Sequence, residues 1–308
     1  LGTDDIIDAV HEGKRLPILL LPAIFFGTVL THLCGGSAGR EGAALQMGGT
    51  IGQCMGRTFR LDDRDLRVAT LAGMAAFFPA LFGTPLAATV FAIMVISIGV
   101  LYHVALYPSL LAALVAYGVS VRLGVEPTRF TVAVPDQSVG MFVRVAALGV
   151  LCALVSILFC KLMHGAGHLM KRIKNPWLRV ICGGFAVIAL TWVFGTDYNG
   201  AGMDIVTRAI EQETVAVPWA FLLKLVFTAV TLAAGFKGGE VVPSFFVGAA
   251  FGCVAAGWLG LPAGFGAAMG LVSVFCGAVN CPLASIILSV ELFGSGDLLY
   301  FAMACSIS

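Results

Sequence analysis

Three glutamates, Glu41, Glu240 and Glu291, fall within or beside apolar stretches of the chain, whereas most other acidic residues lie in connecting segments. Removing a carboxylate from water is costly, so each of these side chains needs a structural or functional reason. Glu41 lies where we expect a helix to begin, and the N-terminus of a helix favours a negative charge. An ionised Glu41 would occupy this anion site, and a protonated one would leave it. One residue could thus link anion entry to proton uptake.

Each glutamate also has a structural interpretation. Glu41 could be a capping carboxylate that is paired permanently with Arg40. Glu240 could accept backbone N–H bonds that hold a broken segment of helix, and this interpretation is nearly as strong as a transport role. For Glu291, which lies near the end of an expected helix, we favour the structural interpretation.

Phe245 and Phe246 follow Pro243 closely, so we expect one of their rings to face a cavity in the protein. The edge of an aromatic ring carries a positive partial charge and can contact a small anion, although packing in the core is the commoner role of phenylalanine.

Enzyme and metal chemistry find little support in the sequence. The segment from Gly35 to Gly39 satisfies the pattern G-x-S-x-G, with Ser37 as a nucleophile, but that motif needs a strand-to-helix turn with partner His and Asp residues. His164 and His168 have helical spacing but lie in a basic segment, and the nine cysteines form no CxxC pair. We expect no enzyme activity, no metal and no cofactor, and we keep a membrane hydrolase using Ser37 as the alternative from another class.

The elements that must position these residues are membrane helices. Hydrophobic residues make up 59% of the 308 residues and charged residues 11%, and the mean hydropathy is +0.98. This composition predicts an all-α integral membrane protein with no soluble domain, whose partner is the lipid bilayer. The net charge of +1 gives no indication of nucleic-acid binding. Apolar stretches long enough to cross, or nearly cross, the hydrocarbon recur at 16–33, 66–82, 143–159 and 180–194.

An internal repeat organises these stretches. A Gly-rich segment containing Glu41 precedes a Pro-Leu-Ala step at Pro85 by 44 positions, and one containing Glu240 precedes a second such step at Pro282 by 42. Duplicated units of this kind commonly form inverted halves with an ion site between them. We therefore predict halves at residues 1–139 and 140–308, with broken helices that meet at mid-membrane and line one cavity. Glycines four apart, such as Gly48 and Gly52, or Gly248 and Gly252, suit close helix packing.

The segment from Gly39 to Gly42, followed by Ala-Ala-Leu-Gln-Met-Gly-Gly, resembles the G-[KR]-E-G-P gating segment of the CLC chloride channels and antiporters. The segment from Gly238 to Pro243 resembles the anion-site segment of the same family. Two features resemble its fluoride/proton-exchanging branch, namely Ala43 in place of proline and the string GFKGGEV at 235–241. Val95 stands where chloride/proton antiporters have an inner proton glutamate, which fits either a channel or the fluoride branch, and the GFKGGEV string favours the latter. The branch usually has threonine where Val242 stands.

The resemblance covers essentially the whole chain and implies a CLC-type inverted repeat that exports fluoride from the cytoplasm while protons enter. It implies a homodimer in the bacterial inner (plasma) membrane, with halide anions and protons as partners. Glu41 becomes the gating and proton-coupling residue. The implied anion-binding or pathway residues are Gly39, Arg40, Gly42, Glu240, Val241, Val242, Phe245 and Phe246.

Two further expectations accompany this resemblance. A chloride channel or chloride/proton antiporter of the same family remains the alternative. The chain resembles a fragment truncated at both ends, because the first site helix would begin before Leu1 and the tyrosine that closes the anion site would follow Ser308. Tyr300 is too early in the sequence to be that tyrosine.

Overall fold

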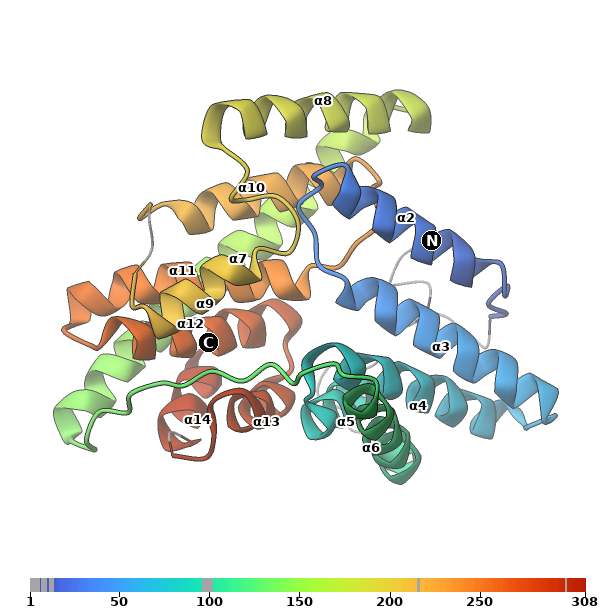
Figure 1. Ribbon diagram of the computed structural model, residues 1–308, viewed down its shortest axis with the longest axis horizontal. Helices are drawn as coiled ribbons and strands as arrows, with labels where there is room; N and C mark the ends of the chain where they lie inside the picture. The colour runs from blue at the N-terminus through green and yellow to red at the C-terminus, as the bar shows by residue number, and fades with distance from the viewer. Residues whose placement is uncertain (1–5, 7–9, 11–13, 96–101, 215–216, 297) are drawn as a thin grey trace. The chain divides into compact units, whose positions relative to one another are not determined.

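The computed structural model describes residues 6, 10, 14–95, 102–214, 217–296 and 298–308. Within these residues the secondary structure is helical (Figure 1), and the single β-type pairing joins Gly39 to Gly239. The predicted all-α fold is therefore confirmed.

The chain packs into two compact units. Unit 1 comprises Leu1–Phe26 and Glu41–Arg129, and unit 2 comprises Gly27–Arg40 and Phe130–Ser308. These packing units differ from the two sequence halves predicted above, whose division at residue 139 falls at the start of a long helix.

Unit 1 is built around two long helices, α3 and α4, that pack closely along each other, with α5 and α6 against α4. Helix α2 (Leu20–Leu33) begins in this unit and ends in unit 2. The other helices of unit 1 are α3 (Glu41–Thr58), α4 (Asp63–Phe82), α5 (Pro85–Met94), the 3₁₀ turn η1 (His103–Ala105) and α6 (Leu106–Arg122).

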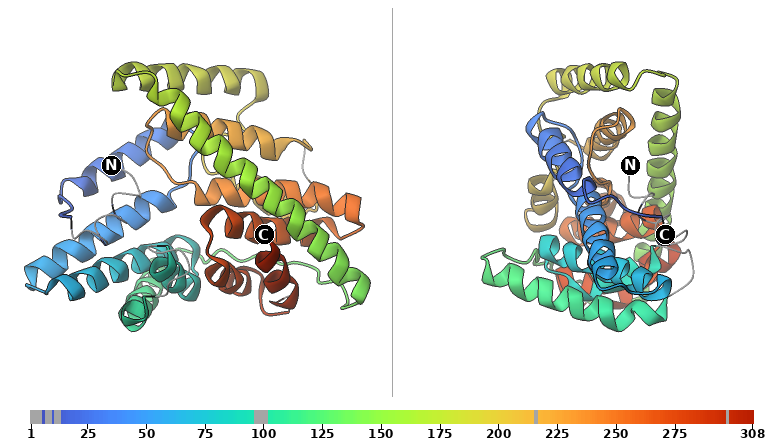
Figure 2. Two further views of the ribbon diagram at one scale, coloured as in Figure 1. Left: turned by 180° about the vertical axis from the view of Figure 1, so that it is seen from behind. Right: turned by 90° about the vertical axis from the view of Figure 1, so that its right-hand side faces the viewer.

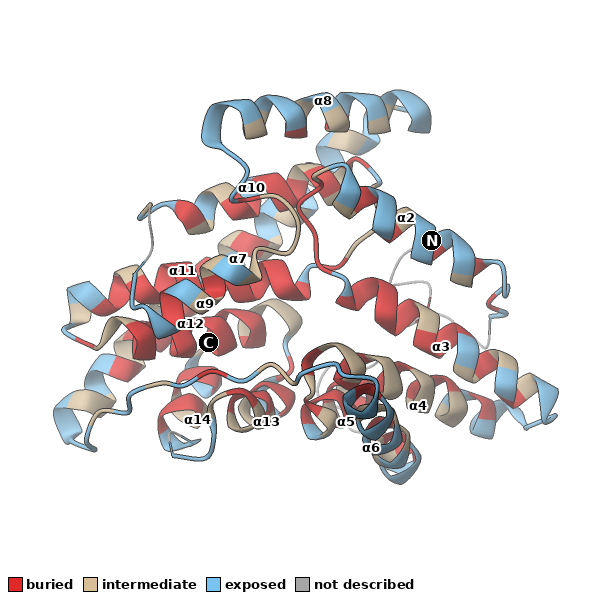
Figure 3. Cartoon of the chain, in the orientation of Figure 1, coloured by how far each residue is buried: buried red, intermediate tan, exposed pale blue. Residues whose placement is uncertain are grey.

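In unit 2 the pair α11 and α12 forms the most deeply buried part, which Figure 3 shows in red. The 33-residue helix α7 runs across α10, α11, α12 and α14, as the left view of Figure 2 shows. The helices of this unit are α7 (Val139–Lys171), α8 (Pro176–Phe194), α9 (Met203–Glu211), α10 (Ala220–Ala233), α11 (Val241–Leu259), α12 (Ala263–Val279), α13 (Pro282–Phe293) and α14 (Leu298–Ile307).

Local sequence signals set several helix ends. Asp62 caps α4 by accepting a hydrogen bond from the N–H of Asp65 at 2.8 Å. Both Pro-Leu-Ala steps begin helices, with Pro85 first in α5 and Pro282 first in α13, where the missing N–H of proline costs nothing. Gly260 ends α11 in the left-handed conformation, at φ 65°.

The repeat is visible in the helices. Helices α2 and α10 are both 14 residues long and start 200 positions apart, at Leu20 and Ala220. Each is followed by a seven-residue break, 34–40 or 234–240, and then by the helix pair α3–α4 or α11–α12. A closely packed pair of long helices thus follows each break, α3–α4 in unit 1 and α11–α12 in unit 2.

Among the described residues, five helical segments are long and apolar enough to cross a membrane, judged by length and composition. They are Asp63–Phe82, His103–Arg122, Val139–Lys171, Pro176–Phe194 and Val241–Leu259. The predicted stretches at 66–82, 143–159 and 180–194 lie within three of them, and the stretch at 16–33 contains the shorter helix α2.

Candidate functional site: two broken helices

The break between α2 and α3 ends at the glutamate that the sequence singled out. Gly35 turns the chain at φ 78°, a conformation that favours glycine. Glu41 is then the first residue of α3 and is fully buried, whereas the neighbouring Arg40 is exposed. The two charges, although adjacent in sequence, lie in different environments. A buried carboxylate at a helix N-terminus is in the place that an anion would favour.

The second break, between α10 and α11, repeats the turn but not the glutamate. Gly235 has φ 102°, and α11 begins at Val241, 200 positions after Glu41. Glu240 is the exposed N-cap residue and makes no side-chain capping hydrogen bond to α11. Glu41 and Glu240 therefore do not occupy equivalent positions, because Arg40 is the residue 200 positions before Glu240.

The two breaks are joined by a symmetric pair of hydrogen bonds. The N–H of Gly39 donates to the carbonyl of Gly239, and the N–H of Gly239 donates to the carbonyl of Gly39, each at 2.8 Å. Gly238 lies so close to Ala38 that a Cβ at this glycine would overlap the Cβ of Ala38. Backbone groups freed by breaking both helices are thus satisfied by each other. Chain connectivity places the N-termini of α3 and α11 two residues beyond this pair.

The phenylalanines after Pro243 are buried in unit 2. The Phe245 ring meets the ring of Phe275 edge-on, with centroids 5.1 Å apart. The Phe246 ring lies 6.3 Å from the ring of Tyr198, also edge-on, and the Lys224 ammonium lies 5.2 Å from the Phe246 centroid. The backbones of Val241 and Val242, which are also buried, form the first turn of α11.

Lys224 was missed by the sequence analysis. It is a fully buried lysine in the middle of the apolar helix α10, and its Nζ donates to the carbonyls of Tyr198 and Gly200 at 3.1 and 2.7 Å. The sequence does contain a signal for it, a lone cation inside an otherwise apolar stretch, which in a membrane protein indicates a function or a specific partner.

Ser37 does not have the surroundings of a hydrolase nucleophile. Its hydroxyl lies 3.0 Å from the hydroxyl of Thr228, and its N–H donates to the hydroxyl of Thr231. It lies between two helices and not at the strand-to-helix turn that G-x-S-x-G requires. In the described part of the chain, no group of three or more His, Cys, Asp or Glu residues could hold a metal ion.

Helices broken at paired glycines, a carboxylate buried at one of the new N-termini and several membrane-spanning segments define an integral membrane transport protein. The family model described as "Voltage gated chloride channel" matches residues 1–308, and the chain belongs to this family. The resemblance to the CLC family is thereby confirmed.

Individual relatives agree with this assignment. The chain is 39% identical to a "Chloride/fluoride channel protein" of Pseudomonas syringae pv. tomato over 99% of its own length and 69% of that protein. A crystal structure of a CLC-type fluoride/proton antiporter matches 99% of the chain and 78% of that protein, with a TM-score of 0.95 and 36% identity. A slow cyanobacterial Cl⁻/H⁺ antiporter shares the fold, with a TM-score of 0.84, 20% identity and coverage of 99% of this chain and 75% of that one.

Proposed function

We propose that the protein exports fluoride in exchange for protons across a bacterial plasma membrane, with Glu41 as the gating and proton-coupling residue. The observation that carries this proposal is the buried carboxylate at the first position of α3, two residues after the paired glycines. When ionised, it holds the place of an anion at the helix N-terminus. When protonated, it loses its charge and yields that place to fluoride.

Fluoride suits the chemistry of these segments. It is small and accepts strong hydrogen bonds, so backbone N–H groups at helix N-termini can replace its water shell. Phe246 adds to this environment, because the Lys224 ammonium lies near its ring, 5.2 Å from the centroid. A cation attracted to the face of a ring leaves the positive ring edge for an anion.

The selectivity for fluoride is supported by the relatives. One is named a chloride/fluoride channel protein and another a fluoride/proton antiporter, and both share more than a third of their aligned residues with this chain. In the same proposal, Gly39, Arg40, Gly42 and Glu240 belong to the ion pathway. Val241, Val242, Phe245 and Phe246 complete this set. The protein works as a homodimer with one pathway in each subunit, and residues 1–139 and 140–308 form its inverted halves.

The test is anion efflux from liposomes that contain the purified protein, with fluoride and chloride measured in parallel and proton uptake recorded at the same time. We expect proton-driven efflux that prefers fluoride. Glu41→Gln removes the titratable group, so exchange should slow by at least about a hundredfold, the lower end of what a positioned acid–base group contributes. Glu211→Gln, at an exposed position of α9, is the matched control and should behave as the unmodified protein.

Chloride movement that equals or exceeds fluoride movement would return the protein to the chloride-transporting members of the family. If Glu41→Gln still exchanged fluoride for protons at the original rate, the role given to Glu41 would be wrong.

A further inference from the structure

We propose that Lys224 is a positioning residue for Glu41, and that it acts through the backbone of residues 36–39. This inference rests on the proposed function, since it concerns the placement of the gating carboxylate. All the contacts that carry it lie within unit 2, and the chain links them to Glu41 through Arg40.

The first contact is the anchorage of the lysine itself. The Lys224 side chain is fully buried, and its ammonium donates hydrogen bonds to the carbonyls of Gly200 and Tyr198. A cation in an apolar interior is tolerated only where such partners compensate for lost hydration. The ammonium also lies 5.2 Å from the Phe246 centroid. These contacts fix the loop 195–202, which connects α8 to α9, against α10.

Gly200 connects Lys224 to the first break, residues 34–40. Its carbonyl accepts from Lys224 Nζ and also from the N–H of Ala38, at 3.2 Å. Its own N–H donates to the carbonyl of Gly36 at 3.0 Å. Gly200 has φ 58°, a conformation that a side chain would disfavour. One residue held by the lysine, Gly200, thus bonds two residues of the segment that leads into α3.

Helix α10 binds Ser37, the residue between Gly36 and Ala38. Lys224, Thr228 and Thr231 follow one another at helical spacing on one face of α10, and all three are fully buried. The Thr228 hydroxyl lies 3.0 Å from the Ser37 hydroxyl, and the Thr231 hydroxyl accepts from the Ser37 N–H at 3.1 Å. Gly200 and the polar face of α10 together therefore fix residues 36, 37 and 38 in succession, before Gly39 pairs with Gly239.

In this proposal, the chain carries the fixed position of residues 36–39 through Arg40 to Glu41, the first residue of α3. A carboxylate that alternates between holding an anion site and accepting a proton must be placed accurately, since small displacements of a reacting group can lower a rate strongly. If a purely structural residue were needed at position 224, an apolar side chain would suit the helix at lower cost. The charge of Lys224 is instead used to bind the carbonyls of Tyr198 and Gly200.

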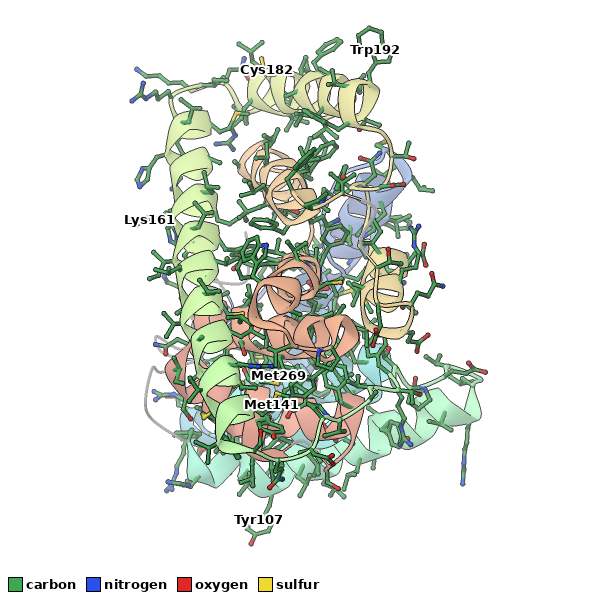
Figure 4. The ribbon with its side chains drawn as sticks, turned by 90° about the vertical axis from the view of Figure 1, so that its left-hand side faces the viewer. Tyr107, Met141, Lys161, Cys182, Trp192 and Met269 are labelled. Atoms are coloured by element: carbon green, nitrogen blue, oxygen red, sulfur yellow. The ribbon has the colours of Figure 1, made fainter. Side chains whose placement is uncertain are left out.

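The experiment measures fluoride efflux and proton uptake together in liposomes containing the Lys224→Met variant. We expect efflux to slow by about ten- to a hundredfold, as for a misplaced reacting group, and the number of protons taken up per fluoride to fall. Lys224→Arg keeps the charge and the donors, so it should restore the proton-to-fluoride ratio. Lys161→Met makes the same change at an exposed position of α7, on the outside of the molecule in Figure 4, and should change neither quantity.

A double variant separates positioning from a general loss of structure. In the Glu41→Gln background there is no titratable group to position, so adding Lys224→Met should produce little further change in anion flux. Additive losses would overturn the proposal, and so would a normal proton-to-fluoride ratio in Lys224→Met. Thr228→Val, which keeps side-chain volume and removes the contact with Ser37, provides a second test should Lys224→Met not fold. The ratio should fall, and an unchanged ratio would overturn the proposal.

These outcomes are distinct from failure of the proposed function. If the unmodified protein moved no fluoride, the proposed function would fail. If it exchanged fluoride for protons and Lys224→Met did so equally well, only the role of Lys224 would be wrong.

Discussion

Glycine is required next to Phe246 for two separate physical reasons. Gly202, the N-cap residue of α9, has φ 79°, a conformation that costs an L residue about 1–2 kcal/mol. A Cβ at this position would also lie 2.7 Å from Cδ2 of Phe246 and 3.4 Å from Nζ of Lys224. Position 202, beside the proposed anion-site residue Phe246 and the buried Lys224, therefore has no room for a side chain.

We expect Gly202→Ala to destabilise the protein by about 2–4 kcal/mol, because about 1–2 kcal/mol of backbone strain adds to displacement of the Phe246 ring. Unfolding by SDS in mixed micelles, followed through tryptophan fluorescence, would measure this loss. Gly124→Ala is the control, since Gly124, in the turn that ends α6, has φ 85° but open space around it. It should show the strain alone, about 1–2 kcal/mol. Equal losses in the two variants would show that the contact with Phe246 has no energetic weight.

At the scale of elements, the two central helix pairs pack through backbone contact. A Cβ at Gly48 of α3 would overlap the carbonyl of Gly73 in α4, and one at Gly252 of α11 would overlap the carbonyl of Gly266 in α12. Small residues permit this approach, and in lipid, where packing replaces the hydrophobic effect as the force between helices, the approach is what stabilises each pair. The predicted role of the glycines spaced by four is confirmed.

Gly252→Ala should therefore destabilise unit 2 by about 1–3 kcal/mol, the usual cost of overpacking. The same micellar unfolding measurement applies. Gly257→Ala, five residues later on α11, points a methyl group into open space and should be neutral or stabilising by about 0.5–1 kcal/mol, as for glycine replaced in an exposed helix. If both variants behaved alike, close approach of α11 and α12 would not explain the glycines.

At the scale of the molecule, large apolar side chains remain outside. Helix α8 is mostly exposed (Figure 3), and its exposed residues include Phe185, Ile188 and Trp192. Trp192 projects away from the helix in Figure 4. In water such a surface would associate with other proteins. In a bilayer it contacts the acyl chains, in agreement with the length and composition of this helix.

A charge placed on this surface tests the assignment to lipid. Ile188→Lys, one turn from the middle of α8, should destabilise the membrane-embedded protein by about 2–3 kcal/mol, the cost of lysine near a bilayer centre. The yield of folded protein in membranes and its unfolding in micelles would both report this loss. Val125→Lys, at an exposed position between α6 and α7, should stay within about 0.5 kcal/mol. A neutral Ile188→Lys would exclude α8 from the hydrocarbon region.

The sequence alone determined that the protein is helical, that its solvent is the bilayer and that two similar segments are broken by glycines. These properties follow from local composition and from spacing along the chain, and the family resemblance follows from short motifs such as 39–42. The sequence also singled out Glu41 as the proposed gating residue, because a carboxylate next to a glycine-rich break is visible without a fold.

Only the tertiary structure decided how the breaks meet. Two hydrogen-bonded contacts join residues far apart in the chain, Gly39 with Gly239 and Lys224 with Gly200. The exposure of Glu240 likewise depends on which segments pack around it. Pairing the two glutamates by sequence misplaced them by one residue, because they are 199 positions apart, whereas the hydrogen-bonded Gly39 and Gly239 are 200 apart. The role of Lys224 depends on the carbonyls of Tyr198 and Gly200, which only the folded chain brings to its ammonium, so no local sequence pattern could predict it.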